Sequence, residues 1–164
     1  MHTEFHPLPQ PEEISNKERN DATGSYMMML ISMGVGLPLP FINLLAAWFY
    51  YEVMKKKSRF VRFHALQSLL SQLPITLLNS VAVVWFVLRL IAIGGDFFGM
   101  EVLTFVLVLG AFNLLYFILS IVGAVNAHRG RMYYMPVIGA YSYRVAFRVS
   151  QDDFKVTPSN EPPA

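Results

Sequence analysis

The sequence predicts an all-α, polytopic membrane protein with three transmembrane helices, the first broken by proline, followed by a C-terminal interfacial amphipathic segment. Hydrophobic residues make up 54% of the 164 positions and charged residues only 15%, whereas a soluble domain carries about 25% charged residues. The apolar residues form three blocks, each longer than the roughly 20 residues that a helix needs to cross a bilayer. We therefore expect one membrane domain at 26–150, between disordered tails at 1–25 and 151–164.

The N-terminal segment 1–25 is polar, contains Pro7, Pro9 and Pro11, and shows no helical spacing of apolar residues. A segment of this composition buries too little apolar surface to offset the entropy lost on ordering. It also has no basic leader followed by an apolar run, as a secretory signal would. The first span is therefore expected to direct membrane insertion.

The first predicted span, at about 26–51, is interrupted by the sequence GVGLPLP, which contains Pro38 and Pro40. Each proline removes a backbone donor and disfavours helix in the residue before it. A bilayer tolerates such a break only where protein or water satisfies the freed carbonyl groups. The break is therefore expected to face other helices, either as a packed kink or as half of a discontinuous helix that lines a transport site.

The second predicted span, at about 65–93, begins with a polar stripe. At 100° per residue, one helix face holds His64, Gln67, Ser68, Ser71, Gln72 and Asn79. Polar groups inside a bilayer are costly unless they are paired, so this face is expected to turn toward the other spans. For His64 two interpretations are open: a proton-responsive switch at the cytoplasmic mouth, or a structural hydrogen bond to a carbonyl group freed at the proline break.

The third predicted span, at about 98–127, carries a matching face of small or polar residues: Gly110, Asn113, Tyr116, Ser120, Gly123 and Ala127. Small residues on one face allow two membrane helices to approach closely. We therefore expect the second and third spans to pack along their stripes, with Ser32 and Gly36 of the first span beside them.

The segment 137–149 combines aromatic, apolar and basic residues, and Pro136 prevents it from extending the third span. As a helix it places Val137, Ile138, Tyr141 and Val145 on one face, which is typical of a segment lying in the headgroup plane. Alternation between apolar and polar residues from 141 to 149 would equally suit a strand. The helix is the preferred interpretation.

The charges predict the topology. Five bases lie between the first two spans: Lys55, Lys56, Lys57, Arg59 and Arg62. Short basic loops stay on the cytoplasmic side, and such bases attract anionic lipid at ~1 kcal/mol each. The loop near 94–101 holds Asp96 and Glu101 without a base, and the segment after the third span is basic again. The N-terminus is therefore expected outside and the C-terminus in the cytoplasm.

The second span starts with the motif FVRFHALQ at 60–67, and the third span is followed by Gly130 and by YYMP at 133–136. Over about 26–141 this pattern resembles a family of small bacterial membrane proteins that includes the magnetosome protein MamF. That family is distantly related to the twenty-kilodalton subunit of the chloroplast inner-envelope import machinery (Tic). The resemblance implies a multi-pass protein of the bacterial inner membrane. The import subunit has four spans rather than three, which weakens a translocation role.

No catalytic, cofactor or metal site is predicted. The chain has no cysteine, which excludes a thiolate metal site and a cysteine nucleophile. Ser68 and Ser71 lie one or two turns from His64, but Asp96 and Glu101 are expected on the opposite side of the membrane, so no acid joins them. Nucleic acid binding is not expected so close to the bilayer.

The sequence thus favours a non-enzymatic accessory or scaffold subunit of a membrane complex, acting in protein translocation or membrane organisation. The alternative is a small oligomeric transporter or channel. The expected partners are anionic headgroups on the cytoplasmic side and other membrane proteins or further copies of the chain. The bases at 55–62 are assigned to the lipid surface, and the residues assigned to helix packing or recognition are His64, Gln67, Ser68, Ser71, Pro38, Pro40 and Asn113.

Overall fold

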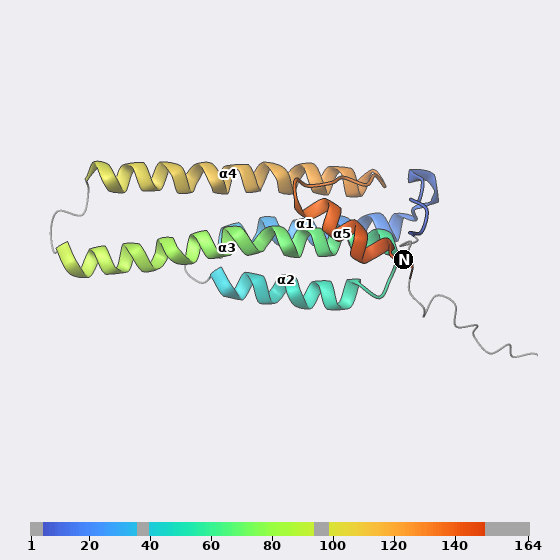
Figure 1. Ribbon diagram of the computed structural model, residues 1–164, viewed down its shortest axis with the longest axis horizontal. Coiled ribbons are helices and arrows are strands. Elements are labelled where there is room, and N and C mark those ends of the chain that lie inside the picture. The colour runs from blue at the N-terminus through green and yellow to red at the C-terminus, as the bar shows by residue number, and fades with distance from the viewer. Residues whose placement is uncertain (1–4, 36–39, 94–98, 150–164) are drawn as a thin grey trace, which may run out of the picture.

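The computed structural model describes residues 5–35, 40–93 and 99–149, which form an elongated helical bundle (Figure 1). This part of the chain is all-α, as the sequence predicts, apart from one isolated β-bridge. A 3-10 turn precedes five helices: η1 (Pro11–Glu13), α1 (Asn16–Val35), α2 (Pro40–Met54), α3 (Arg59–Ile93), α4 (Met100–His128) and α5 (Ile138–Phe147).

Two helices of the described residues, α3 and α4, are long and apolar enough to cross a membrane. At 1.5 Å per residue they extend about 50 Å and about 43 Å, and a hydrocarbon core is about 30 Å thick. Only 11% of the most apolar 18-residue window of each helix is buried, whereas the core helix of a soluble protein is mostly buried. Their exposed surfaces carry large aliphatic side chains such as Leu77, Leu88, Leu107 and Leu114, which suits contact with lipid.

The expectation of a third, proline-broken span is wrong for this structure, because the first apolar block forms two antiparallel helices. The backbone carbonyl of Asp21, early in α1, accepts a hydrogen bond from Tyr50 Oη, late in α2, at 2.8 Å. Such a contact requires the chain to reverse between α1 and α2, as Figure 1 shows. α2 begins at Pro40, where the fixed φ of proline favours a helix start. Pro38 and Gly36 lie outside the described residues, as do the side chains of Ser32 and Pro40.

The reversal also corrects the predicted topology. Asp21 forms an ion pair with Lys57 of the basic loop at 2.8 Å, and the backbone N–H of His6 donates to the carbonyl of Phe147 at 2.9 Å. Phe5 and Arg148 form an isolated antiparallel β-bridge. Residues 5–21, the basic loop and α5 therefore lie at one end of the bundle. An N-terminal segment outside the membrane and a basic loop inside it are incompatible with these contacts.

The N-terminal segment is more ordered than its composition suggests. The backbone N–H and hydroxyl of Ser15 donate to Glu18 Oε2 at 3.0 and 2.7 Å, and the Glu18 N–H donates to Ser15 Oγ at 3.3 Å. This is a reciprocal capping box, which starts α1 at Asn16. The side chain of Ile14 is buried, and so is Ala22. The predicted C-terminal tail at 151–164 lies outside the described residues.

The core lies where α1 packs between α3 and α4. The small face predicted on the third span contacts α1 at Gly123, where an added Cβ would lie 2.5 Å from the Tyr26 ring. Beyond α1, the two long helices meet directly through Asn79 and Asn113 and through the Trp85 and Phe105 rings, whose centroids are 4.5 Å apart. These direct contacts between the second and third spans lie in the second half of α3 and the first half of α4.

α5 is a helix, so the strand alternative for this segment does not hold. It packs on α3 through a buried face that includes Gly139, Ser142 and Ala146. The residues predicted to form its apolar face point the other way, since Val137 is 94% and Tyr141 is 57% exposed. Ala146 and Phe147 form a buried cluster with Phe63 of α3, and the exposed Val137 and Tyr141 remain available to lipid.

Candidate functional site

The predicted polar stripe of α3 is buried against α1. His64, Gln67, Ser68 and Ser71 are each less than one-tenth exposed. Their common partner is the side of α1 that carries Ser25, Tyr26 and Met29. We call this contact the polar seam: His64, Gln67, Ser68 and Ser71 of α3, with Ser25, Tyr26 and Met29 of α1.

Tyr26 is the centre of the polar seam. Its hydroxyl lies 2.9 Å from Nδ1 of His64 and accepts a hydrogen bond from Gln67 Nε2 at 2.8 Å. The Tyr26 hydroxyl thus bonds both side chains, and the tautomer of His64 sets which group donates in the contact with Nδ1. All three side chains are fully buried, and a buried tyrosine needs such a partner for its hydroxyl.

Gln67 links α3 to the segment that follows α4. Its Nε2 donates to the backbone carbonyl of Tyr133 at 2.9 Å, and its Oε1 accepts from the backbone N–H of Met135 at 3.1 Å. These contacts satisfy two backbone groups in a stretch without regular structure. One side chain therefore connects α1, α3 and residues 133–135.

The two serines complete the seam. Ser68 Oγ donates to the carbonyl of Ser25 at 2.7 Å, between α3 and α1. Ser71 Oγ donates to the carbonyl of Ser68 at 2.8 Å and lies 3.6 Å from Met29 Sδ. A serine that bonds to the carbonyl of its own helix conceals its hydroxyl from lipid, and Ser68 adds a direct link to α1.

His64 sits among aromatic rings. Its ring makes edge contacts with Phe60, Phe63 and Tyr26, at centroid distances of 4.6, 5.0 and 5.6 Å. Its expected partner was a carbonyl at the proline break, but in the structure it bonds the Tyr26 hydroxyl of α1. His64 thus links α3 to α1 by a hydrogen bond inside the bundle.

Asn113, predicted as a packing residue, forms a reciprocal amide pair with Asn79. Asn113 Nδ2 donates to Asn79 Oδ1 at 3.0 Å, and Asn79 Nδ2 donates back to Asn113 Oδ1 at 3.2 Å. Asn113 also donates to the carbonyl of Leu109 at 2.9 Å. The pair joins α3 and α4 directly, beyond the part of α3 that forms the polar seam with α1.

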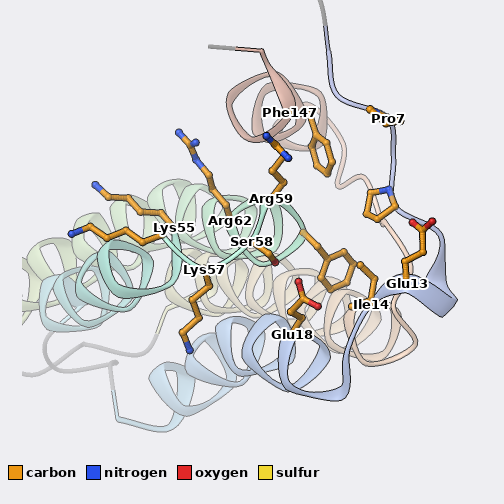
Figure 2. Close-up of a pocket in the computed structure, with 13 residues that line it drawn as sticks. Pro7, Glu13, Ile14, Glu18, Lys55, Lys57, Ser58, Arg59, Arg62 and Phe147 are labelled. Atoms are coloured by element: carbon orange, nitrogen blue, oxygen red, sulfur yellow. The ribbon is translucent and has the colours of Figure 1, made fainter. Parts of the chain in front are cut away.

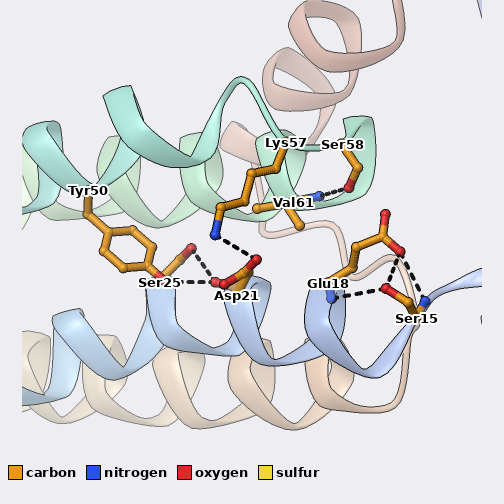
Figure 3. Close-up of polar contacts among 8 residues, drawn as sticks. All are labelled: Ser15, Glu18, Asp21, Ser25, Tyr50, Lys57, Ser58 and Val61. Carbon is orange, nitrogen blue, oxygen red and sulfur yellow. Dashed lines mark hydrogen bonds and ion pairs between the residues drawn. The ribbon is translucent and has the colours of Figure 1, made fainter.

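The basic loop connects α2 and α3 at the end of the bundle where α1 begins. Figure 3 shows Lys57 reaching across to Asp21 of α1, beside the Tyr50 contact with the Asp21 carbonyl and the Ser15–Glu18 capping box. Lys55 pairs with Glu52 at 2.6 Å and lies over the Tyr51 ring. Two of the five predicted lipid-surface bases therefore have carboxylate partners within the protein.

Sequence reasoning did not identify five contributors to the site: Ser25, Tyr26, Met29, Tyr133 and Met135. Tyr26 marks the first residue of the first apolar block, and a tyrosine there was open to interpretation as an interfacial anchor. Tyr133 and Met135 contribute backbone groups, which residue types do not reveal. Among the described residues, no three His, Cys, Asp or Glu side chains lie close enough together to hold a metal ion.

Comparison with known proteins yields one family. A model of the magnetosome magnetite crystal formation protein family matches residues 21–142. The matched range begins in α1, contains the whole polar seam and the basic loop, and ends in α5. The chain matches no curated protein and no solved structure.

Proposed function

We propose a scaffold function for this chain, which belongs to the magnetosome magnetite crystal formation protein family. In this proposal it is a non-enzymatic subunit of a membrane complex that organises the membrane around it. The family is one of magnetosome-associated membrane proteins, and the two long apolar helices fit a membrane protein. The family description names magnetite crystal formation and does not mention protein translocation, the role suggested by the resemblance to the import subunit.

The observation that carries the proposal is the position of Gln67. It joins α1, α3 and residues 133–135 through three hydrogen bonds inside the bundle, while the outer surfaces of α3 and α4 are aliphatic. A unit that buries a hydrogen-bonded polar seam and presents an apolar exterior is suited to packing beside lipids or other membrane helices.

The alternative, an oligomeric transporter or channel, needs a polar pathway. The polar stripe of α3 would be the natural lining for one, yet α1 covers it with Tyr26 and Ser25. A pathway along this stripe would require α1 to leave its position and break the polar seam. The geometry therefore favours the scaffold.

The proposed topology places the N-terminal segment, the basic loop and α5 on the cytoplasmic side, since basic segments are retained there. α1 and α2 then form a hairpin that enters the membrane and returns to the same side. The chain has no cysteine, so single cysteines can be introduced at the exposed residues Lys17, Lys56, Arg129 and Met100.

In sealed membrane vesicles, a membrane-impermeant thiol reagent should label the cysteines at 17, 56 and 129 from one side and the cysteine at 100 from the other. Labelling of position 17 from the same side as position 100 would contradict the hairpin. Permeabilised vesicles, in which all four cysteines should react, provide the control for accessibility.

The scaffold function is tested by purification in mild detergent after crosslinking in the cell. A scaffold should copurify with other membrane proteins in a fixed ratio, whereas a transporter should purify as a homo-oligomer and conduct ions or solutes in liposomes. In a cell that forms magnetite, deletion of the gene should give fewer or smaller crystals by electron microscopy. Unchanged crystals, or flux through a homo-oligomer, would count against the proposal.

A further inference from the structure

A cavity opens at the end of the bundle where α3 begins (Figure 2). Its volume is about 540 Å³, and its walls come from the N-terminal segment, the basic loop, the first turn of α3 and the end of α5. We propose that this cavity binds the phosphate group of an anionic phospholipid. The inference is independent of the scaffold function and requires only that the protein lies in a membrane.

The walls of the cavity combine basic and apolar side chains. All five bases predicted for the lipid surface line it, against two acids, Glu13 and Glu18. Apolar parts of the wall are contributed by Ile14, Phe60 and Phe147. Cations next to an apolar wall match a phospholipid, which carries its phosphate beside its glycerol and acyl chains.

The two acids in the wall are already engaged by the protein. Glu13 accepts a hydrogen bond from the backbone N–H of Gln10 at 2.8 Å, and Glu18 accepts from both the N–H and the hydroxyl of Ser15. The Ser15 hydroxyl also lowers the pKa of Glu18. These carboxylates stabilise the start of η1 and of α1, so they are not solely counterions for the bases of the cavity.

Arg62 has a hydrogen-bond donor that no described residue accepts. Its Nε is buried and has no hydrogen-bond partner in the part of the chain that the structure describes. Lys55 and Lys57 have carboxylate partners, and Arg62 differs from them in this respect. A guanidinium presents a planar fork that matches phosphate oxygens, so a phosphate would supply the missing acceptor.

The backbone adds to the positive potential. Ser58 precedes α3, and its Oγ accepts from the backbone N–H of Val61 at 3.3 Å. The first turn of this 35-residue helix lines the cavity, and the N-terminal end of a helix carries a partial positive charge that favours anions. Helix dipole, basic side chains and the buried Nε all favour a bound anion.

The location indicates a lipid phosphate rather than a soluble one. The cavity lies where α3 passes from the basic loop into its apolar length, and aromatic residues of the type found at membrane interfaces, Trp48, Tyr50 and Tyr51, precede the loop. At that level phospholipid headgroups surround a membrane protein, so their local concentration far exceeds that of free phosphate.

The test uses native mass spectrometry of the full chain in mild detergent, with phosphatidylglycerol, with phosphatidylcholine of the same acyl chains, and with inorganic phosphate as the soluble probe. The cavity variant is Arg59→Gln with Arg62→Gln. The matched control, Arg129→Gln with Arg131→Gln, removes the same charge from exposed residues near that end of the bundle but outside the cavity. Circular dichroism checks that both variants fold.

We expect one phosphatidylglycerol per chain, bound in preference to phosphatidylcholine. The cavity variant should bind it about 25-fold more weakly, because each base near a membrane surface contributes about fivefold, and the control should keep most of its affinity. Arg62→Lys, which keeps the charge but loses the fork, should show an intermediate loss.

Four results would overturn the proposal. Equal loss in the cavity variant and the control would show diffuse attraction to the whole basic surface, and loss in neither would exclude the cavity. Equal binding of phosphatidylglycerol and phosphatidylcholine would remove the preference for an anionic lipid. Saturable binding of inorganic phosphate without binding of phosphatidylglycerol would confirm a phosphate site but would exclude the lipid as its ligand.

Discussion

The two halves of α3 lie in opposite environments although they form one continuous helix. In the first half, Phe60, Phe63, His64 and Gln67 are almost completely buried. In the second half, Val84, Leu88, Leu90 and Ile91 are between 57% and 76% exposed. The first half is therefore a protein interface, and the second half has the surface of a lipid-facing helix.

The difference follows from the length of the α1–α2 hairpin. Because α1 and α2 run antiparallel and reverse between residues 35 and 40, they cover only the first half of α3. Polar side chains in a bilayer need partners, and they occur where partners exist. Beyond the hairpin, Asn79 pairs with Asn113 of α4, and Arg89 pairs with Glu101 at the far end at 2.9 Å.

The strongest test of this comparison is to truncate one residue in each environment. Gln67→Ala should lower the free energy of unfolding by about 3 kcal/mol or more, because it leaves the Tyr133 carbonyl and the Met135 N–H unsatisfied at about 1–3 kcal/mol each. Leu107→Ala, in a residue 64% exposed on α4, should change it by less than about 0.5 kcal/mol. Thermal unfolding in mild detergent measures both. A large loss in Leu107→Ala would show that this face contacts protein instead of lipid.

An identical substitution at two glycines of α4 gives the next largest effect. Gly123→Ala places a Cβ 2.5 Å from the Tyr26 ring, which its hydrogen bonds hold in place, so we expect a loss of about 1–3 kcal/mol from overpacking. Gly110→Ala meets nothing within 4 Å and should be neutral or stabilising by up to about 1 kcal/mol. Equal unfolding temperatures for the two variants would contradict the close approach of α1 and α4.

The amide pair tests the boundary between the two halves. Asn79→Leu should cost about 1 kcal/mol, the order measured for hydrogen bonds between membrane helices, because Asn113 loses its partner. Asn113→Leu should cost a similar amount. The double variant should lose less than the sum of the two, since neither amide is then left unpaired. A fully additive cycle would show that the two side chains do not interact.

The smallest effect concerns the Ser15–Glu18 capping box at the start of α1. Hydrogen bonding by Ser15 lowers the pKa of Glu18 below its ordinary value of 4.5. The ionised carboxylate therefore contributes stability above pH 4.5, and this contribution is lost as the pH falls through the lowered pKa. We expect an effect well under 1 kcal/mol, because the carboxylate is largely solvent-exposed. The protection factors of the amide hydrogens in the N-terminal turn of α1, which correct for the intrinsic pH dependence of exchange, should fall as the pH drops below 4.5 in the wild type. In Glu18→Gln they should be low both above and below that pH.

Part of the polar seam could be predicted from the residues of α3 alone. His64, Gln67, Ser68 and Ser71 recur at helical spacing, and such a stripe identifies the face that must leave the lipid. The stripe does not specify its partner. It led to two expectations, packing along the third span and contact of His64 and Gln67 with the first. Over this half of α3 the partner is α1, which contributes Tyr26.

The N-terminal residues show a different limit. Proline content and polarity at 1–25 indicated a disordered tail, but the pattern Ser15-x-x-Glu18 is a capping signal that marks the start of a helix. The polar first turns of α1 are ordered through distant contacts, including Asp21 with Lys57 and with Tyr50. Composition averages over a segment and therefore misses single capping residues and contacts from elsewhere in the chain.

The sequence by itself determined that this protein is helical and membrane-embedded, where its two long helices run and which face of α3 is polar. Hydropathy and helical periodicity are properties of consecutive residues, so these features can be read locally. Only the tertiary structure decided that α1 and α2 reverse, that residues 5–21 lie beside the basic loop and α5, and that Tyr26 and Gln67 meet. Those features depend on contacts between residues up to 143 positions apart, such as Phe5 with Arg148. Prolines mark where a helix stops without fixing the direction in which the chain continues.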